Sequence, residues 1–225
     1  EIAWPIRSMF SKSPNVSVFM GEVTGIDLPN QRVLSGEHVL EYDCLVLATG
    51  AVTSYFGNDD WASVAPGLKN ITEATNIRKS LLMAFERAEN SQDEDQKRRL
   101  LNFIVVGGGP TGVEMAGAIA ELAKKTLSDD FRRIDPRDAR IILAEGGPRL
   151  LAAFPEDLSD YTQKSLESIG VEVRVGQAVT EITAQGAKIG DEFIPSANVI
   201  WGAGVQVPDL KDWTQKPADR GGRVK

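Results

Sequence analysis

Short apolar runs and longer helical patterns alternate along this chain. Residues 103–106 read FIVV, a continuous apolar run typical of a strand that is buried on both faces of a sheet. A glycine-rich turn follows, and residues 113–125 then carry apolar side chains at helical spacing. Residues 140–145, RIILAE, return to a strand pattern. Strand, turn, helix and strand in this order predict a βαβ unit in an α/β protein with a parallel sheet.

The turn after the first of these strands has the G-x-G-x-x-G spacing of a dinucleotide-binding loop. Gly107 permits the tight turn, Gly109 lets the backbone approach a pyrophosphate, and Gly112 lets the helix pack closely on the strand. Pro110 suits the first helical turn, where its missing N–H costs nothing, and the remaining free N–H groups can bind phosphate. The predicted loop comprises Gly107, Gly108, Gly109, Pro110, Thr111 and Gly112.

An acidic residue, Glu145, ends the second strand of the βαβ unit. It lies 38 residues after Gly107 because the connection carries an insertion at 126–138, whereas roughly 20 residues are usual. Its carboxylate can accept both hydroxyls of an adenine ribose and would repel a 2′-phosphate, which favours NAD over NADP. The nearby Arg149 weakens that preference. The flanking strand, helix and acid favour a dinucleotide site over a merely structural glycine turn.

Two segments of the chain resemble one another. VSVFMGEVTGID starts at Val16 and VEVRVGQAVTEIT starts at Val171, and a turn-rich hairpin follows each. Each copy then ends in a strand with small residues, YDCLVLATGA or ANVIWGAGV, and the copies are offset by 155 residues at their first glycine and 154 at their last. This near-constant offset indicates a duplicated unit rather than two unrelated hairpins. It places the first unit's own phosphate loop before residue 1, so we expect a piece of a longer protein.

Composition narrows the chemistry. The 225 residues carry a net charge of −7, which argues against affinity for nucleic acid or anionic lipid. A single cysteine, Cys44, excludes a disulfide framework within the chain, and a single histidine, His38, leaves no His-based metal site or Ser-His-Asp triad. We expect Cys44 to be buried in its apolar strand and His38 to be exposed. Without a run of about 18 apolar residues or a signal peptide, a reducing cytoplasm is the expected setting.

The motifs together resemble those of the two-dinucleotide flavoprotein reductases, and most closely the type II NADH dehydrogenases, which are single-chain NADH:quinone reductases. The resemblance implies an α/β fold in which a Rossmann-like three-layer NAD-binding domain is inserted in an incomplete FAD-binding domain of the same type. The expected parts are the end of the first FAD segment at 1–70, a helical linker at 71–100, the NAD(H)-binding domain at 101–204 and the return to the FAD domain at 205–225. The stretches that carry the resemblance are ATG at 48–50, GLKNITEATNIRKSLLMAFERAE at 67–89, GGGPTGVE at 107–114, DFRRIDPRDARI at 130–141, GPRLLAAFPEDLS at 147–159 and VEVRVG at 171–176.

The resemblance also implies roles for individual residues. Glu114, in the first turn of the phosphate-binding helix, would lie near the nicotinamide and the flavin and assist hydride or proton transfer. The alternative is an acid that complements the helix dipole. Small residues at strand ends either close a turn or let a cofactor approach. By resemblance, FAD would be contacted by Val23, Ala48, Thr49 and Gly50, and the nicotinamide side would be admitted by Ala203 and Gly204.

The function favoured by these expectations is an FAD-dependent NADH oxidoreductase that holds nicotinamide and flavin together and passes electrons on to a quinone. The quinone-contacting segment and the helices that attach such enzymes to the cytoplasmic face of the inner membrane would lie outside this chain, which we expect to be inactive alone. One alternative is a related reductase with a disulfide or ferredoxin acceptor. Another is a non-catalytic NAD-binding module that senses redox state. Unpaired strand edges in residues 1–70 leave room for a homodimer.

Overall fold

The computed structural model describes residues 4–208, 210–215, 217 and 219. The chain divides into two compact units, which are taken separately below. The inserted unit comprises residues 53–205, and the outer unit comprises 1–52 together with 206–225. One unit therefore interrupts the sequence of the other. The chain passes between them at β4 (Val52–Thr53) and β12 (Val205–Gln206), which pair with one another.

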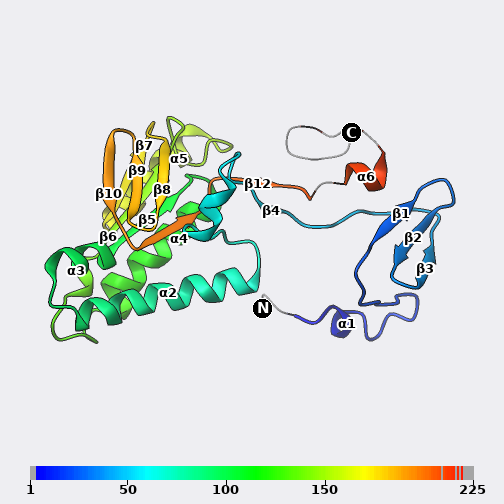
Figure 1. The fold of residues 1–225 in the computed structure, drawn as a ribbon, viewed down its shortest axis with the longest axis horizontal. Coiled ribbons are helices and arrows are strands. Elements are labelled where there is room, and N and C mark those ends of the chain that lie inside the picture. The colour runs from blue at the N-terminus through cyan, green and yellow to red at the C-terminus, as the bar shows by residue number, and fades with distance from the viewer. Residues whose placement is uncertain (1–3, 209, 216, 218, 220–225) are drawn as a thin grey trace. The chain divides into compact units, whose positions relative to one another are not determined.

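A four-stranded sheet forms the centre of the inserted unit (Figure 1). Its order is β11 (Asn198–Trp201), β5 (Asn102–Val106), β6 (Arg140–Glu145) and β7 (Val171–Val175), and all neighbours are parallel. The central strands are almost wholly buried because both faces of the sheet are covered. The strands predicted at 103–106 and 140–145 are thus confirmed, together with their parallel pairing.

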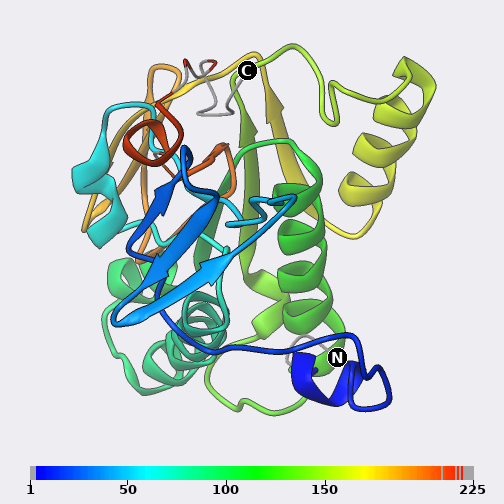
Figure 2. The ribbon, with the colours of Figure 1, turned by 90° about the vertical axis from the view of Figure 1, so that its right-hand side faces the viewer.

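Helices cover one face of this sheet, as Figures 1 and 2 show. They are α2 (Ile71–Asn90), α3 (Glu94–Leu101), α4 (Pro110–Glu121) and α5 (Glu156–Ser168). Because side chains alternate along a strand, Phe103 and Val105 of β5 face the helices. The ring of Phe85 on α2 stacks on Phe103, with centroids 5.4 Å apart.

The other face of the parallel sheet is covered by an antiparallel meander. It consists of β8 (Val179–Thr183), β9 (Gly186–Ile189) and β10 (Glu192–Pro195). The alternate β5 residues Ile104 and Val106 pack here, in one hydrophobic cluster with Ile189 and Ile194. Helices, parallel sheet and meander make three layers, so the predicted Rossmann-like three-layer α/β architecture is confirmed.

Residues 53–100 belong to the inserted unit, although the sequence analysis divides them between an FAD segment and a linker. Tyr55 and Trp61 are buried against Trp201, with ring centroids 5.3 and 5.5 Å from its ring. Leu81 and Phe85 place the apolar face of α2 in the cluster beneath the helices. A helix that buries one face in a core is part of that domain, so the structural boundary falls at Thr53.

The insertion at 126–138 is tied back to the helical layer. It follows a π-helical turn, Leu122–Thr126, and contains a 3₁₀ turn, Pro136–Asp138. The carboxylate of Glu89 on α2 accepts the backbone N–H groups of Arg132, Arg133 and Ile134 at 3.2, 2.8 and 3.1 Å. Desolvation opposes ionisation of Glu89, but these N–H groups outweigh it and hold the pKa of the carboxyl below its ordinary value.

The outer unit contains a second meander, formed by β1 (Gly25–Asp27), β2 (Arg32–Ser35) and β3 (His38–Glu41). Two short helices, α1 (Ile6–Met9) and α6 (Lys211–Thr214), belong to the same unit. The strands β8, β9 and β10 begin 154 residues after β1, β2 and β3 respectively (179 − 25, 186 − 32 and 192 − 38). The predicted duplication therefore appears in the structure as two meanders whose corresponding strands begin at a constant offset.

The strands expected at 16–21 and 42–50 of the first repeat are not formed. A strand requires a ladder of backbone hydrogen bonds to a neighbour, and among the described residues no such ladder forms with either segment; at the start of the second, Tyr42 alone donates its N–H to the carbonyl of Gln31, at 3.0 Å. Most of their apolar side chains remain exposed, with Met20 at 91% and Val46 at 85%, while Val18 and Leu45 are half-buried. Cys44 is likewise exposed, so the expectation that it packs inside an apolar strand is wrong. His38 is exposed in β3, as expected.

Candidate nucleotide-binding site

The glycine loop stands at the carboxyl ends of three adjacent parallel strands. The N–H of Gly107 donates to the carbonyl of Ala144 at the end of β6, at 2.8 Å. On the other side, the N–H of Gly202 after β11 donates to the carbonyl of Val106, at 2.7 Å. This edge, outside the carboxyl ends of parallel strands, is where ligands bind in open α/β sheets.

The three fingerprint glycines differ in what surrounds them. Gly107 has φ +109°, and a Cβ there would lie 2.5 Å from the Cα of Ala203. A Cβ on Gly112 would lie 1.7 Å from the carbonyl oxygen of Gly107. Gly109 has no heavy atom within 4 Å of the corresponding position, and its φ is −76°. Gly107 and Gly112 are therefore required by packing, whereas the space before Gly109 is open.

The amino end of α4 opens the same space. Gly109 is its N-cap residue, Pro110 lies in its first turn, and no side chain caps the helix. The first N–H groups of a helix have no partner within it, and they carry the positive end of the helix dipole. Together with the open side of Gly109, this end of α4 has the geometry of an anion-binding site.

Glu145 reaches the glycine loop directly. One carboxylate oxygen accepts the N–H of Gly108 and the other accepts that of Gly147, both at 2.6 Å. The side chain is partly buried, and these bonds fix its orientation. A carboxylate offers about four lone-pair sites, so it retains capacity for ribose hydroxyls. The structure thus brings the predicted strand-end acid into contact with the predicted loop.

Glu114, Ala203 and Gly204, the residues predicted on the nicotinamide side, differ from one another in exposure and contacts. Glu114 is the fifth residue of α4, so it lies in the second turn and not in the first turn as expected. It is exposed, and its side chain makes no hydrogen bond or ion pair with the described part of the chain. Ala203 is half-buried beneath the loop. A Cβ on Gly204 would lie 2.5 Å from the ring of Phe56, and the carbonyl of Gly204 accepts the N–H of Ser54 at 3.1 Å. Close packing is thus one reason for a glycine at 204.

The residues expected to contact FAD lie in the outer unit. Val23 is 38% exposed, and Ala48, Thr49 and Gly50 are exposed as well. Gly50 has φ +73° with open space around it. This is a left-handed backbone conformation that favours glycine, so the turn at 48–50 has a conformational reason for its last residue.

Sequence reasoning missed the partners of Arg149, which it weighed only as a group near the ribose. Its guanidinium donates to the carbonyls of Ala152 and Phe154, both at 2.8 Å, and to the hydroxyl of Ser159 at 2.6 Å. The segment thus closed, residues 149–154, is called the arginine loop below. The N–H of Leu151 in this loop donates to the carbonyl of Gly108 at 2.7 Å. No sequence pattern predicts the hydrogen bonds of Arg149 or that of Leu151.

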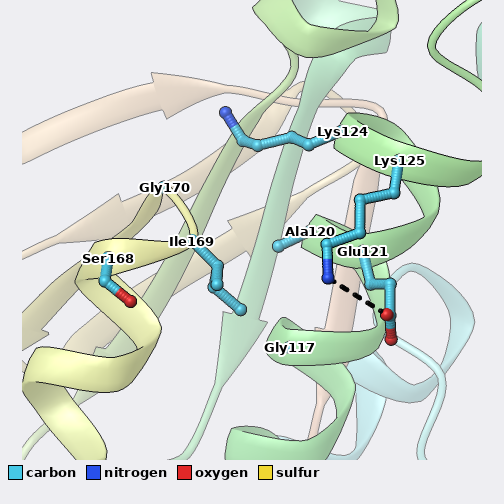
Figure 3. A pocket seen from close by; sticks show the side chains of 8 residues that line it. All are labelled: Gly117, Ala120, Glu121, Lys124, Lys125, Ser168, Ile169 and Gly170. Carbon is cyan, nitrogen blue, oxygen red and sulfur yellow. Dashed lines mark hydrogen bonds and ion pairs between the residues drawn. The ribbon is translucent and has the colours of Figure 1, made fainter.

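A cavity of about 650 Å³ lies away from this edge, beside the carboxyl end of α4 and the end of α5 (Figure 3). Its wall includes Gly117, Ala120 and Ile169, none of which is a predicted site residue. Both lysines at its rim are engaged: Lys125 pairs with Glu121 at 3.4 Å, and Lys124 donates to the backbone at 3.2 Å. The predicted nucleotide-binding residues therefore lie at the glycine loop and not at this cavity.

The three-layer fold, the glycine loop and the strand-end acid are the features that define the dinucleotide-binding class of α/β domains. The model of the pyridine nucleotide-disulphide oxidoreductase family matches residues 5–225, and the chain belongs to that family.

Named relatives sharpen the comparison. The chain is 43% identical to the type II NADH:quinone oxidoreductase Ndh of Mycobacterium tuberculosis, aligned over 100% of this chain and 51% of that protein. It is 29% identical to the external alternative NAD(P)H-ubiquinone oxidoreductase B2 of Arabidopsis thaliana, over 96% of this chain and 40% of the relative. The structure of NDH2 from Plasmodium falciparum in complex with NADH matches with a TM-score of 0.77 and 25% identity, over 88% of this chain and 43% of that one. The chain thus spans about half the length of these relatives.

The described residues contain neither a membrane-spanning helix nor a metal-binding cluster. No helix among them combines the length and apolarity needed to cross a bilayer. Nor do His, Cys, Asp and Glu side chains gather there in groups of three or more that could hold a metal ion.

Proposed function

We propose that this chain binds NADH at its glycine loop and contributes both nucleotide-binding parts to an FAD-dependent NADH:quinone oxidoreductase. The observation that carries the proposal is the pairing of Glu145 with the N–H of Gly108, beside an open Gly109 at the amino end of α4. The named relatives support the electron donor and the acceptor, since they are an NADH:quinone oxidoreductase, an NAD(P)H-ubiquinone oxidoreductase and an NDH2 whose structure contains NADH.

Each predicted site residue has its own role in the proposed enzyme. Glu145 accepts the hydroxyls of the adenine ribose, while the pyrophosphate lies against the N–H of Gly109 and the first turn of α4. Ala203 and Gly204 border the nicotinamide, and Glu114 lies beside it and holds or moves a proton. The inserted unit is the NAD(H)-binding domain, and the outer unit contributes Val23 and residues 48–50 to FAD binding. Bound flavin supplies the two-electron acceptor for the hydride.

Quinone contact, peripheral attachment to the cytoplasmic face of a membrane and dimerisation are further parts of the proposal. An acceptor assay decides between quinone and the two alternatives. Reduction of a disulfide or a ferredoxin in place of quinone indicates the related reductases. NADH binding without any flavin indicates a redox-sensing module.

The test uses the complete gene product that contains these residues. A flavin absorbance band that NADH bleaches, and that a soluble quinone restores, is the expected result. Gly109→Ala is the matched variant: its Cβ enters open space in an ordinary φ, so we expect the Kd for NADH to rise and the stability to fall only by the small amount that alanine costs at an N-cap. Gly117→Ala, in the same helix but away from the loop, is the control and should bind NADH like the wild type. A colourless protein, or equal NADH binding by both variants, refutes the proposal.

A further inference from the structure

We propose that Arg149 and Ser159 are positioning residues that set the affinity for the dinucleotide without touching it. This inference rests on the proposed function and adds to it a device that aims the phosphate-binding backbone. Arg149 makes three hydrogen bonds, to Ala152, Phe154 and Ser159, and these use both terminal nitrogens of its guanidinium. The group that sequence reasoning could assign to a 2′-phosphate is instead engaged in closing the arginine loop.

Ser159 connects this loop to α5. Its side chain is buried, at 2% exposure, and its hydroxyl accepts from Arg149 and donates to the carbonyl of Leu150 at 2.7 Å. Replacing either partner leaves the other without its bond inside a partly desolvated cluster, which costs more than the bond alone. The loop is therefore held at both of its ends by one connected set of hydrogen bonds.

The arginine loop in turn holds the glycine loop. The N–H of Leu151 donates to the carbonyl of Gly108 at 2.7 Å. The side chain of Leu150 is fully buried and fills the space where a Cβ on Gly108 would lie, 2.7 Å from its nearest methyl. Leu151 itself has φ +49°, an unusual backbone angle for such a residue, which persists only where its surroundings enforce it.

The consequence lies in the peptide that joins Gly108 to Gly109. In a trans peptide the carbonyl and the N–H point in opposite directions. With the Gly108 carbonyl held by Leu151, the Gly109 N–H points away from the arginine loop, at a residue whose own Cβ position faces open space. If the arginine loop loosens, this peptide can rotate and the donor for the pyrophosphate is lost.

The test uses the complete flavoprotein and measures Kd, KM and kcat with NADH and with NADPH. Arg149→Met and Ser159→Ala should each raise Kd and KM for both nucleotides by the same factor, roughly fivefold or more. Flavin content and turnover at saturating NADH should stay unchanged. The control is Ser168→Ala, which removes a similar serine-to-carbonyl bond in α5, to Ser165, and should change none of these values.

Other outcomes separate the explanations. If Arg149→Met weakens NADPH alone, Arg149 contacts the 2′-phosphate and the positioning role is wrong. Should Arg149→Met unfold, Ser159→Ala and Arg149→Lys still decide: NADH affinity equal to wild type in both overturns the inference. A wild-type protein that binds no NADH overturns the proposed function itself, and this inference with it.

Discussion

Replacing Gly112 by alanine tests whether the glycine loop is built by packing. Alanine is favoured over glycine in a helix by up to about 1 kcal/mol. However, the added Cβ would lie 1.7 Å from the carbonyl oxygen of Gly107 and 3.3 Å from Leu143. A contact between carbon and oxygen needs about 3.3 Å, so α4 or the loop must move by roughly 1.5 Å. The loop does not move freely, because the N–H of Gly107 is hydrogen-bonded to the carbonyl of Ala144 in β6.

Forcing extra atoms into a close-packed site costs about 1–3 kcal/mol, and more where the neighbour is backbone. After the gain in helix propensity, we expect Gly112→Ala to lower the free energy of unfolding by about 2 kcal/mol or more, which lowers Tm by roughly 4–8 °C. Gly117→Ala is the control, because its Cβ would meet only Leu166 at 3.8 Å. It should raise the stability by up to about 1 kcal/mol. Thermal and urea unfolding followed by circular dichroism measure both. A Gly112→Ala protein at least as stable as the wild type would refute the packing argument.

Three further predictions concern carboxylates. Glu114→Gln should lower the rate of NADH oxidation by the complete enzyme while leaving Tm unchanged, because the side chain has no partner among the described residues; unchanged turnover would exclude it from the chemistry. Glu145→Ala should weaken NADH more than NADPH in calorimetry, because it removes the ribose acceptor and the repulsion of a 2′-phosphate together; equal losses would contradict this. For Glu172, desolvation opposes ionisation, but bonds from Arg140 and Arg174 at 2.8 and 2.6 Å outweigh it and lower the pKa of the carboxyl. Stability from a lowered carboxyl pKa is present above the unfolded value of about 4.3 and is lost as the pH falls through the folded value. The wild type should therefore lose more stability than Glu172→Gln between about pH 5 and 3, and parallel unfolding curves would rule this out.

The part of the fold that sequence reasoning anticipates best is the βαβ unit from Asn102 to Glu145. Its apolar strands, glycine turn and helix each carry a local signal, and all three agree. The glycine spacing also anticipates distinct roles, since packing surrounds Gly107 and Gly112 whereas Gly109 faces open space.

The part it cannot anticipate depends on partners that local patterns do not name. The helical pattern of 71–90 indicates a helix, but nothing in it says that Phe85 will stack on Phe103 rather than face solvent in a linker. The role of Arg149 cannot be predicted from the sequence either, because a guanidinium near the acid expected to bind ribose can donate to a phosphate or to backbone carbonyls. Three-dimensional proximity to Ser159 and to two carbonyls decides between them.

The two repeats show the same distinction within one chain. Both copies form their meander, and each of its strands pairs with a neighbour only a few residues away, so the local sequence suffices. The flanking strands need a parallel partner that is distant in sequence, as β7 needs β6 and β11 needs β5. In the first copy the matching segments, 16–21 and 42–50, have no such partner among the described residues and stay unpaired. Equal sequence patterns therefore yield equal structure where strand pairing is local, and different structure where it is not. Pairing with a distant strand costs loop-closure entropy, and only the contacts with that strand compensate for this cost.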